Sequence, residues 1–180
     1  PTGRCIQKPY ENGLEDYYND ITNRYMHGEF EERDSIKFAD SLKYETPGGR
    51  IVYGGGGIMP DIFTPVDTTG ITDFYSDVTN KGLVYQFAFD FTDSHRKELS
   101  KFDNHKDIIK YLQSNEVLKQ FLQFVKARKD IKLPVKEIKK SDNLISVHLN
   151  AYVCRNILDD EGFYPVIQQI DNALLTAIEK

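Results

Sequence analysis

Four consecutive glycines, at positions 54–57, constrain the fold of this chain more than any other segment. They follow the run Ile51–Tyr53, whose residue types favour a strand, and they precede Pro60 and the apolar pair Ile62 and Phe63. Glycine permits positive φ and the close approach of another backbone, and proline interrupts regular structure. The segment is therefore predicted to form a strand, a glycine turn and a second short strand.

A glycine-rich loop also raises the question of phosphate binding. A P-loop ends in Gly-Lys-Ser/Thr and opens a helix whose N-terminus faces the phosphate. Here Gly57 is followed by Ile58, Met59 and Pro60, so the lysine is missing and the proline prevents a helix from starting in the required place. The sequence therefore argues against phosphate binding at this loop.

Two segments together resemble the C-terminal processing peptidases, which are serine peptidases with a Ser-Lys dyad. The segments are PTGRCIQ at residues 1–7 and GGGIMPDI at residues 55–62, and they match, in order, the family's segment TPSGRSIQGKGIxPDI. Residues 8–54 lie between them as an insertion, and residues 63–180 resemble the helical C-terminal extension of Bacteroidetes-like members. In this family both dyad residues precede the motif, so the resemblance implies a fragment that lacks the catalytic pair.

The predicted fold class is α+β and mainly helical, with two domains. Residues 1–66 are expected to form the C-terminal edge of the peptidase domain, including an inserted helix at 15–27 and a β-hairpin at 42–53 that turns at Pro47-Gly48-Gly49. Residues 3–7 are expected to end a strand. Residues 67–180 are expected to form a helical domain.

Apolar residues recur at helical spacing through most of this second domain. Ser141 is the predicted N-cap of one helix, and Pro165 is expected in the first turn of the last helix. Residues 83–91 also alternate as a strand would, and a helix is chosen because the helix-forming sequence HRKELSKF follows and the resemblance favours it. The predicted helices lie at 70–80, 83–91 and beyond, around 108–112, at 118–125, 142–158 and 163–178.

Two short motifs imitate the penicillin-binding proteins, but neither is assigned a catalytic role. Ser94 and Lys97 form an S-x-x-K, and residues 141–143 form S-D-N, while the third signature, K-T-G, is missing. An exposed helix face and a helix N-cap explain the two motifs. The histidines are dispersed and have no metal-like or triad-like spacing, so no catalytic, metal-binding or cofactor-binding residue is predicted. They are His27, His95, His105 and His148.

Composition excludes further classes of function. The net charge of -5 gives no general attraction to nucleic acid, and no apolar run has the length of a membrane span.

Cys5 and Cys154 are expected to be free thiols and small buried hydrophobes. A basic stretch lacks interleaved aromatic residues and is interpreted as a solvated connector between helices. It contains Lys126, Arg128, Lys129, Lys132, Lys136, Lys139 and Lys140.

The resemblance implies the non-catalytic C-terminal region of a peptidase that cleaves polypeptides near their C-termini in the cell envelope, in the periplasm. Such a chain would be inactive alone, would meet polypeptide substrates through its parent enzyme and would need no cofactor. Its exposed strand edges near residues 1–7 would fray or lead to self-association. The alternative is a helical protein-interaction module without a peptidase role. A serine in a Gly-Ser-Ala-like loop and a Gly-Lys-Gly upstream of Pro1 would distinguish the two.

Overall fold

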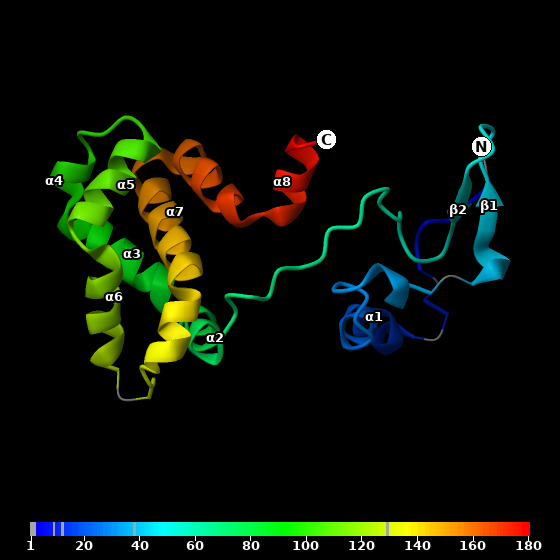
Figure 1. The fold of residues 1–180 in the computed structure, drawn as a ribbon, viewed down its shortest axis with the longest axis horizontal. Helices are drawn as coiled ribbons and strands as arrows, with labels where there is room; N and C mark the ends of the chain where they lie inside the picture. The colour runs from blue at the N-terminus through cyan, green and yellow to red at the C-terminus, as the bar shows by residue number, and fades with distance from the viewer. Residues whose placement is uncertain (1–2, 9, 12, 38, 129) are drawn as a thin grey trace. The chain divides into compact units, whose positions relative to one another are not determined.

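The structure is a computed structural model, and it describes residues 3–8, 10–11, 13–37, 39–128 and 130–180. Within these residues it is mainly helical, with eight α-helices and one two-stranded antiparallel sheet, as the sequence predicts (Figure 1). The chain divides into two compact units, Pro1–Val66 and Asp67–Lys180, which are called the N-terminal unit and the helical unit below.

The N-terminal unit contains one helix and one hairpin. Helix α1 (Leu14–Met26) ends before Gly28, whose φ of 75° cannot continue a helix. Strands β1 (Lys43–Glu45) and β2 (Ile51–Tyr53) pair antiparallel, with Tyr44 opposite Val52. The predicted helix and hairpin are therefore confirmed. Short 3₁₀ turns at Arg33–Ser35 and Asp40–Leu42 complete the unit.

The strands predicted at residues 3–7 and 62–63 do not form within the described part of the chain. Instead, the N-terminal segment crosses the glycine loop, where the amides of Gly55 and Gly57 donate to the carbonyls of Cys5 and Ile6 at 2.8 and 2.7 Å. A Cβ on Gly54 would lie 2.8 Å from the Cys5 oxygen. The glycines therefore serve close backbone approach rather than a turn between two strands.

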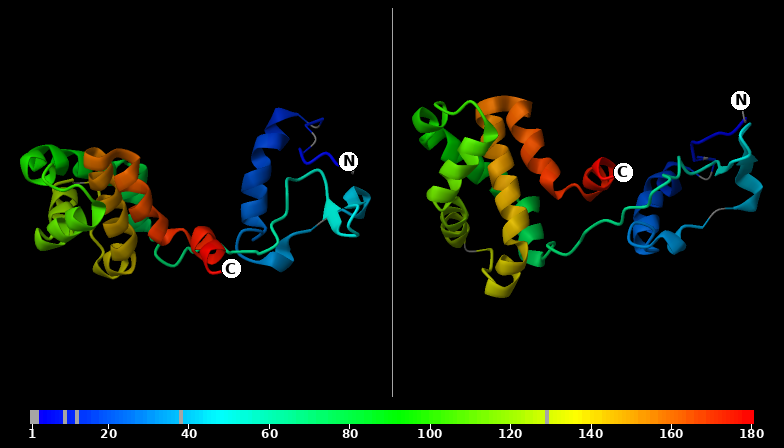
Figure 2. Two further views of the ribbon diagram at one scale, coloured as in Figure 1. Left: turned by 90° about the horizontal axis from the view of Figure 1, so that it is seen from above. Right: turned by 45° about the horizontal axis from the view of Figure 1, so that its top comes forward.

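The helical unit is built around one long central helix (Figures 1 and 2). Helix α7 (Val135–Ile167) packs against α2, α3, α5 and α6, and the core lies between them. The remaining helices are α2 (Asp73–Asn80), α3 (Leu83–Ser94), α4 (Arg96–Leu99), α5 (His105–Ser114), α6 (Val117–Lys126) and α8 (Asn172–Ile178), with a 3₁₀ turn at Gln168–Ile170 before α8.

Burial explains why residues 83–91 form a helix rather than a strand. Leu83, Val84, Phe87, Ala88 and Phe91 are all buried, which is a spacing of three and four residues. The aromatic side chains that complete the alternating pattern fall outside this face and remain exposed. The choice of a helix is confirmed.

Ser141 is not a helix N-cap, contrary to the sequence prediction. Helix α7 begins six residues earlier, at Val135, and Ser141 is buried inside it. Its hydroxyl donates to the Gly70 carbonyl at 2.8 Å and lies 2.7 Å from the Thr72 hydroxyl. Thr72 in turn caps α2 by accepting from the Tyr75 amide. The serine therefore fastens the start of α2 to α7, a long-range role that local spacing does not reveal.

The predicted break between the helices at 142–158 and 163–178 is present as a bend, and the second of these helices is itself interrupted by the 3₁₀ turn at Gln168–Ile170. Asp159 has φ 52° and ψ -140°, so α7 bends there into a first segment, 135–158, and a second segment, 160–167. Pro165 lies beyond the first turn of the second segment, not within it. Gly162 permits this bend, because a Cβ there would lie 2.5 Å from the Cys154 carbonyl oxygen. Among the described residues, no helix combines the length and apolar character needed to cross a bilayer.

Candidate functional site

The S-x-x-K motif does not place its two residues on one helix. Ser94 is the last residue of α3, and its hydroxyl donates to the Asp90 carbonyl at 2.8 Å. Lys97 lies in α4, on the other side of the break at His95, and is exposed. Ser141, from the S-D-N motif, is committed to Gly70 and Thr72.

The histidines occupy separate structural positions. His95 is half-buried, stacks on Phe91 with ring centroids 4.1 Å apart, and its Nδ1 lies 2.9 Å from the Phe91 carbonyl oxygen. His148 is also half-buried and bonds to the Leu144 carbonyl. Within the part of the chain that the structure describes, no group of three or more His, Cys, Asp or Glu side chains has metal-site geometry.

The two cysteines are free thiols in different environments. Cys154 is buried, as predicted, and burial raises the pKa of its thiol to about 12. Cys5 is exposed, so its predicted burial is wrong. The segment that holds it lies over the glycine loop rather than inside a core.

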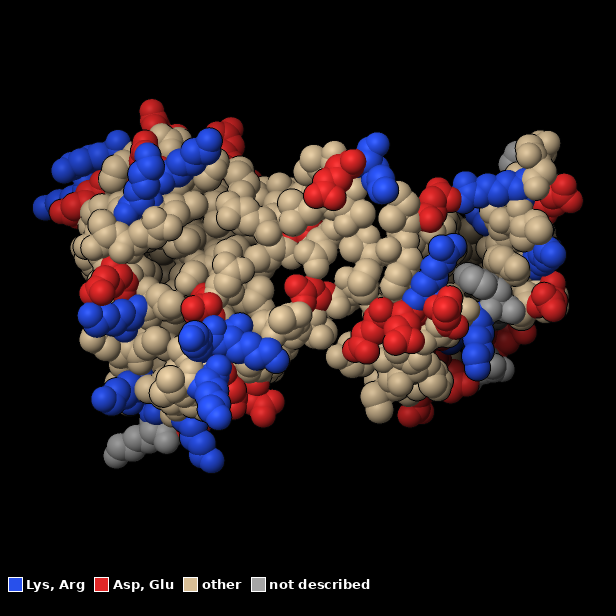
Figure 3. Space-filling view, in the orientation of Figure 1, with Lys and Arg blue, Asp and Glu red and all other residues tan. Residues whose placement is uncertain are grey.

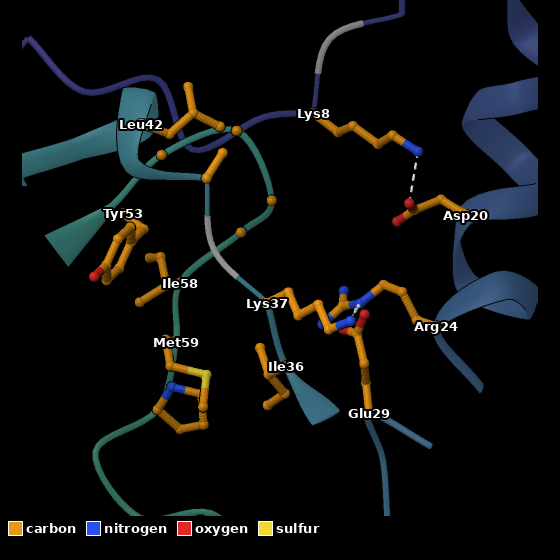
Figure 4. A pocket seen from close by; sticks show the side chains of 16 residues that line it. Lys8, Asp20, Arg24, Glu29, Ile36, Lys37, Leu42, Tyr53, Ile58 and Met59 are labelled. Carbon is orange, nitrogen blue, oxygen red and sulfur yellow. Dashed lines mark hydrogen bonds and ion pairs between the residues drawn. The ribbon is translucent and has the colours of Figure 1, made fainter. Parts of the chain in front are cut away.

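A pocket of about 320 Å³ lies beside the glycine loop in the N-terminal unit (Figure 4). On one side Lys8 pairs with Asp20 at 2.6 Å, and Arg24 pairs with Glu29 at 2.8 Å. The other side is apolar and includes Leu42, Tyr53, Ile58 and Met59. Carboxylates already neutralise these two cations, and the amides of Gly55 and Gly57 already donate to carbonyls. The amides of Gly54, Gly55 and Gly57 therefore serve the fold of the loop rather than a phosphate, although Lys37 also lines the pocket.

A set of aromatic side chains, most of them in ring contact, forms the most distinctive exposed feature of the helical unit. It comes from α2, α3 and both segments of α7, and it is called the aromatic surface. The surface consists of Tyr75, Tyr85, Phe89, His148, Tyr152, Phe163 and Tyr164.

Ring-to-ring contacts link these helices. Tyr152 is central: its ring meets Tyr85 edge-on at 5.4 Å, stacks on Phe163 at 6.0 Å and lies 6.3 Å from His148. His148 contacts Tyr75 at 5.9 Å. Such pairs hold one another in place and add stability beyond area burial. The contacting rings therefore hold one another in place although none of them is fully buried.

Three large side chains of the aromatic surface leave about half of their area in solvent. Tyr85, Phe89 and Tyr164 leave 53, 51 and 50% of their surface in solvent. Tyr85 and Phe89 are one helical turn apart and share a face of α3. Sequence reasoning missed this site, although the signal was present: two large aromatic residues lie off the buried face of a predicted helix.

Positive charge gathers at the end of the helical unit where α6 meets α7 (Figure 3). The predicted basic stretch lies there, except that Lys129 is outside the described residues. Arg128 lies over the Phe124 ring at 5.0 Å and donates to the Gln86 side chain at 3.2 Å. Five lysines are exposed and form no ion pair with a described carboxylate: Lys126, Lys132, Lys136, Lys139 and Lys140.

Comparison with known proteins finds similarity to a family whose function is not known. Residues 74–159 match a family of unknown function (DUF8443). The match extends from the first turn of α2 to the bend at Asp159, and it includes five of the seven residues of the aromatic surface. No curated protein and no solved structure matches the chain significantly.

These findings overturn the resemblance to the C-terminal processing peptidases. The family that matches is a different one, and no peptidase family matches any part of the chain. The two short segments that carried the resemblance, 1–7 and 55–62, both lie outside the matched region. The expected peptidase parent and its envelope location therefore lose the observation on which they depended.

Proposed function

We propose that the helical unit is a protein-interaction module and that the aromatic surface is its binding site. The observation that carries the proposal is the exposure of ordered, mutually contacting aromatic side chains on α3 and α7. Contiguous exposed apolar patches on a folded unit mark interaction sites. Tyrosine and phenylalanine are enriched at the centres of such sites because they bury a large area with few rotatable bonds.

Folding of the helical unit does not require the aromatic side chains of Tyr85 and Phe89. Helix α3 already buries its opposite face through Val84, Phe87 and Phe91 against α6 and α7. Tyr85 and Phe89 add little to that core, since each leaves about half of its surface in water. A polar residue would serve as well on a face that only meets solvent. Burial in the core does not account for these two exposed rings, whereas contact with a partner does.

Ring contacts also prepare the surface for binding. Tyr152, which is half-buried, is held between Tyr85 and Phe163, and the guanidinium of Arg155 lies 5.0 Å from the Phe163 ring. Side chains that are already ordered lose less conformational entropy when a partner covers them. The surface therefore combines apolar area with preorganisation.

A peptide-display selection with the full chain tests the proposal. A random library is selected against the 180-residue protein, and the recovered peptides are titrated against the Tyr85→Ser/Phe89→Ser double variant. Hot-spot aromatic residues each contribute about 2 kcal/mol or more, so we expect affinity to fall by at least about tenfold. Circular dichroism and urea unfolding establish that the variant remains folded.

A matched control removes exposed apolar side chains elsewhere. Tyr18 and Ile21 lie on α1 of the N-terminal unit and are more exposed than Tyr85 and Phe89. The Tyr18→Ser/Ile21→Ser variant should bind the same peptides with unchanged affinity. Peptides that bind equally well to the α3 variant, or a selection that yields no specific binder, would contradict the proposal.

A further inference from the structure

The five exposed lysines at the α6–α7 junction form a second surface feature, called the lysine cluster: Lys126, Lys132, Lys136, Lys139 and Lys140. Seven of the 15 residues from Lys126 to Lys140 are Lys or Arg, and only two are acidic. Both acidic residues are engaged elsewhere: Asp130 pairs with Lys81 at 2.8 Å, and Glu137 accepts from the Phe74 amide at 2.9 Å. The lysines of the cluster thus form no ion pair with a described carboxylate, although Glu137 and the exposed Asp142 lie near them on α7.

The lysine cluster adjoins the aromatic surface through two helices. On α2, the amide of Phe74, the residue before Tyr75, donates to the side chain of Glu137, the residue after Lys136 on α7. On α3, Arg128 from the junction bonds to Gln86, the residue next to Tyr85. The cluster therefore stands at one end of the aromatic surface.

The other end carries the opposite charge. Asp90 and Asp93 are exposed at the C-terminal end of α3, and Asp159 and Asp160 are exposed at the bend of α7. Asp93 pairs with Arg96 and Asp160 with Arg155, each at 3.6 Å, so Asp90 and Asp159 are the carboxylates of this group that form no ion pair with a described residue. The Thr92 and Asn156 side chains bond at 3.2 Å and hold these two helix ends together. A ligand that lies along the aromatic surface therefore meets lysines first and carboxylates last.

Resting on the proposed function, we infer that the partner is a protein segment in which acidic residues adjoin apolar side chains. The acidic residues pair with the lysine cluster, and the apolar ones cover Tyr85 and Phe89. The two-signed surface favours a protein over a nucleic acid or an anionic membrane, because a uniformly negative ligand would be repelled at the Asp90 end. The lysines also fix the direction in which the segment lies.

Two display libraries of equal apolar content test the inference on the full chain. One carries four fixed Glu residues beside the random segment, and the other carries four fixed Lys residues. We expect at least about tenfold more binders from the Glu library, since complementary charge raises the association rate and like charge is costly. Equal yields from the two libraries, or a preference for the Lys library, would overturn the inference.

The recovered Glu-library peptide is then titrated by fluorescence anisotropy against the Lys136→Glu/Lys140→Glu variant. We expect at least about tenfold weaker binding, and weaker binding of the unchanged protein as salt rises, because exposed charges are screened. The control is Lys97→Glu/Lys106→Glu, which reverses two exposed lysines on α4 and α5 and should change affinity less than about twofold. Equal affinity for the two double variants would contradict the inference.

Two further probes separate this inference from the proposed function and from other anionic ligands. Binding could be lost in Tyr85→Ser/Phe89→Ser and unchanged in Lys136→Glu/Lys140→Glu. That result would support the interaction module and contradict the inference that its partner is acidic. A DNA duplex of about 15 base pairs and phosphatidylserine vesicles should both bind more weakly than the peptide. Tighter binding of either would replace the acidic protein segment with that ligand.

Discussion

Helices α1 and α6 are both amphipathic, α6 more strongly, but their surroundings differ. Helix α1 places Tyr17, Ile21 and Tyr25 on one face, yet none of its residues is buried. Helix α6 is shorter, and its Phe121 and Val125 are fully buried against α3 and α7. The difference applies to the units as a whole: every buried residue lies between Phe74 and Val166, and none of the described residues before 67 is buried.

A hydrophobic pattern thus predicts that a helix forms but not that it is buried. Helical spacing of apolar residues is enough to predict a helix, but burial needs several elements that meet around one another. In the helical unit α7 supplies the surface on which four other helices pack. Among its described residues the N-terminal unit has one α-helix, two 3₁₀ turns and a two-stranded hairpin, and a lone hairpin is marginally stable. Stability should therefore reside almost entirely in the helical unit.

The two cysteines give the largest expected difference between the units. With a disulfide reagent at about pH 8, Cys5 should react at the rate of an exposed thiol, whereas Cys154 should react at least about 10³-fold more slowly because its reaction requires opening of the core. Stopped-flow and manual absorbance measurements resolve the two phases, and Cys5→Ser assigns them. Two fast phases would mean that the two thiols do not differ in protection.

Truncation of a large aromatic residue should depend on the unit in which it lies. Phe121→Ala removes a fully buried ring and should lower the free energy of unfolding by about 3–5 kcal/mol. Tyr18→Ala removes an exposed ring from α1 and should change it by less than about 0.5 kcal/mol. Urea unfolding followed by far-ultraviolet circular dichroism measures both. Equal losses would mean that α1 contributes to a core.

Replacing a glycine should also lower the stability more in the helical unit than in the N-terminal unit. Gly162→Ala would place a methyl group 2.5 Å from the Cys154 carbonyl oxygen and should cost about 1–3 kcal/mol, since the bend at Asp159 would have to open. Gly48 lies in the hairpin turn, where a Cβ would meet open space, and it serves as the control; Gly48→Ala should be close to neutral. A neutral Gly162→Ala would show that the second segment of α7 does not pack as described.

Alkaline pH provides a smaller effect that is specific to the helical unit. The Cys154 thiol has a pKa of about 12 in the folded chain, against 9.0 for an unperturbed thiol. The unfolded chain releases this proton first, so the stabilisation is complete below about pH 9 and is lost as pH rises toward about 12. Between about pH 8 and 10 the natural chain should lose about 1 kcal/mol more stability than Cys154→Ala, as urea unfolding at each pH will measure. Parallel pH dependences would contradict the burial of this thiol.

Local sequence pattern predicts the elements of this chain better than their long-range contacts. The hairpin and α1 follow from turn residues and spacing, and both form as predicted. The spacing of residues 83–91 fits a helix and a strand equally, and the choice of a helix there depends on the sequence that follows and on a resemblance that the comparisons overturn. Ser141 is misassigned from sequence because its partners, Gly70 and Thr72, are about 70 residues away in the chain. The break after residue 158 is predicted from spacing, but the close packing of Gly162 on Cys154 at the bend exists only in three dimensions.

The candidate site illustrates the same limit. The basic stretch and the aromatic residues of α3 are both visible in the sequence, but nothing in their spacing indicates that they adjoin. Tyr152 and Phe163 contact each other only because α7 bends between them. The absence of interleaved aromatic residues favours a solvated connector when the stretch is considered alone. In the fold, Gln86 and Arg128 join the junction to α3 beside Tyr85.

The most direct test of the aromatic surface uses a single tryptophan, because the chain contains none. Phe89→Trp places an indole on the aromatic surface, and Tyr18→Trp places one on α1 as the control. When a display-selected peptide is added to saturation, the emission of the Phe89→Trp variant should shift to shorter wavelength as a partner covers the indole, while that of the Tyr18→Trp variant should stay unchanged. A shift in the Tyr18→Trp variant with none in Phe89→Trp would place binding in the N-terminal unit and contradict the assignment of the binding site to the aromatic surface.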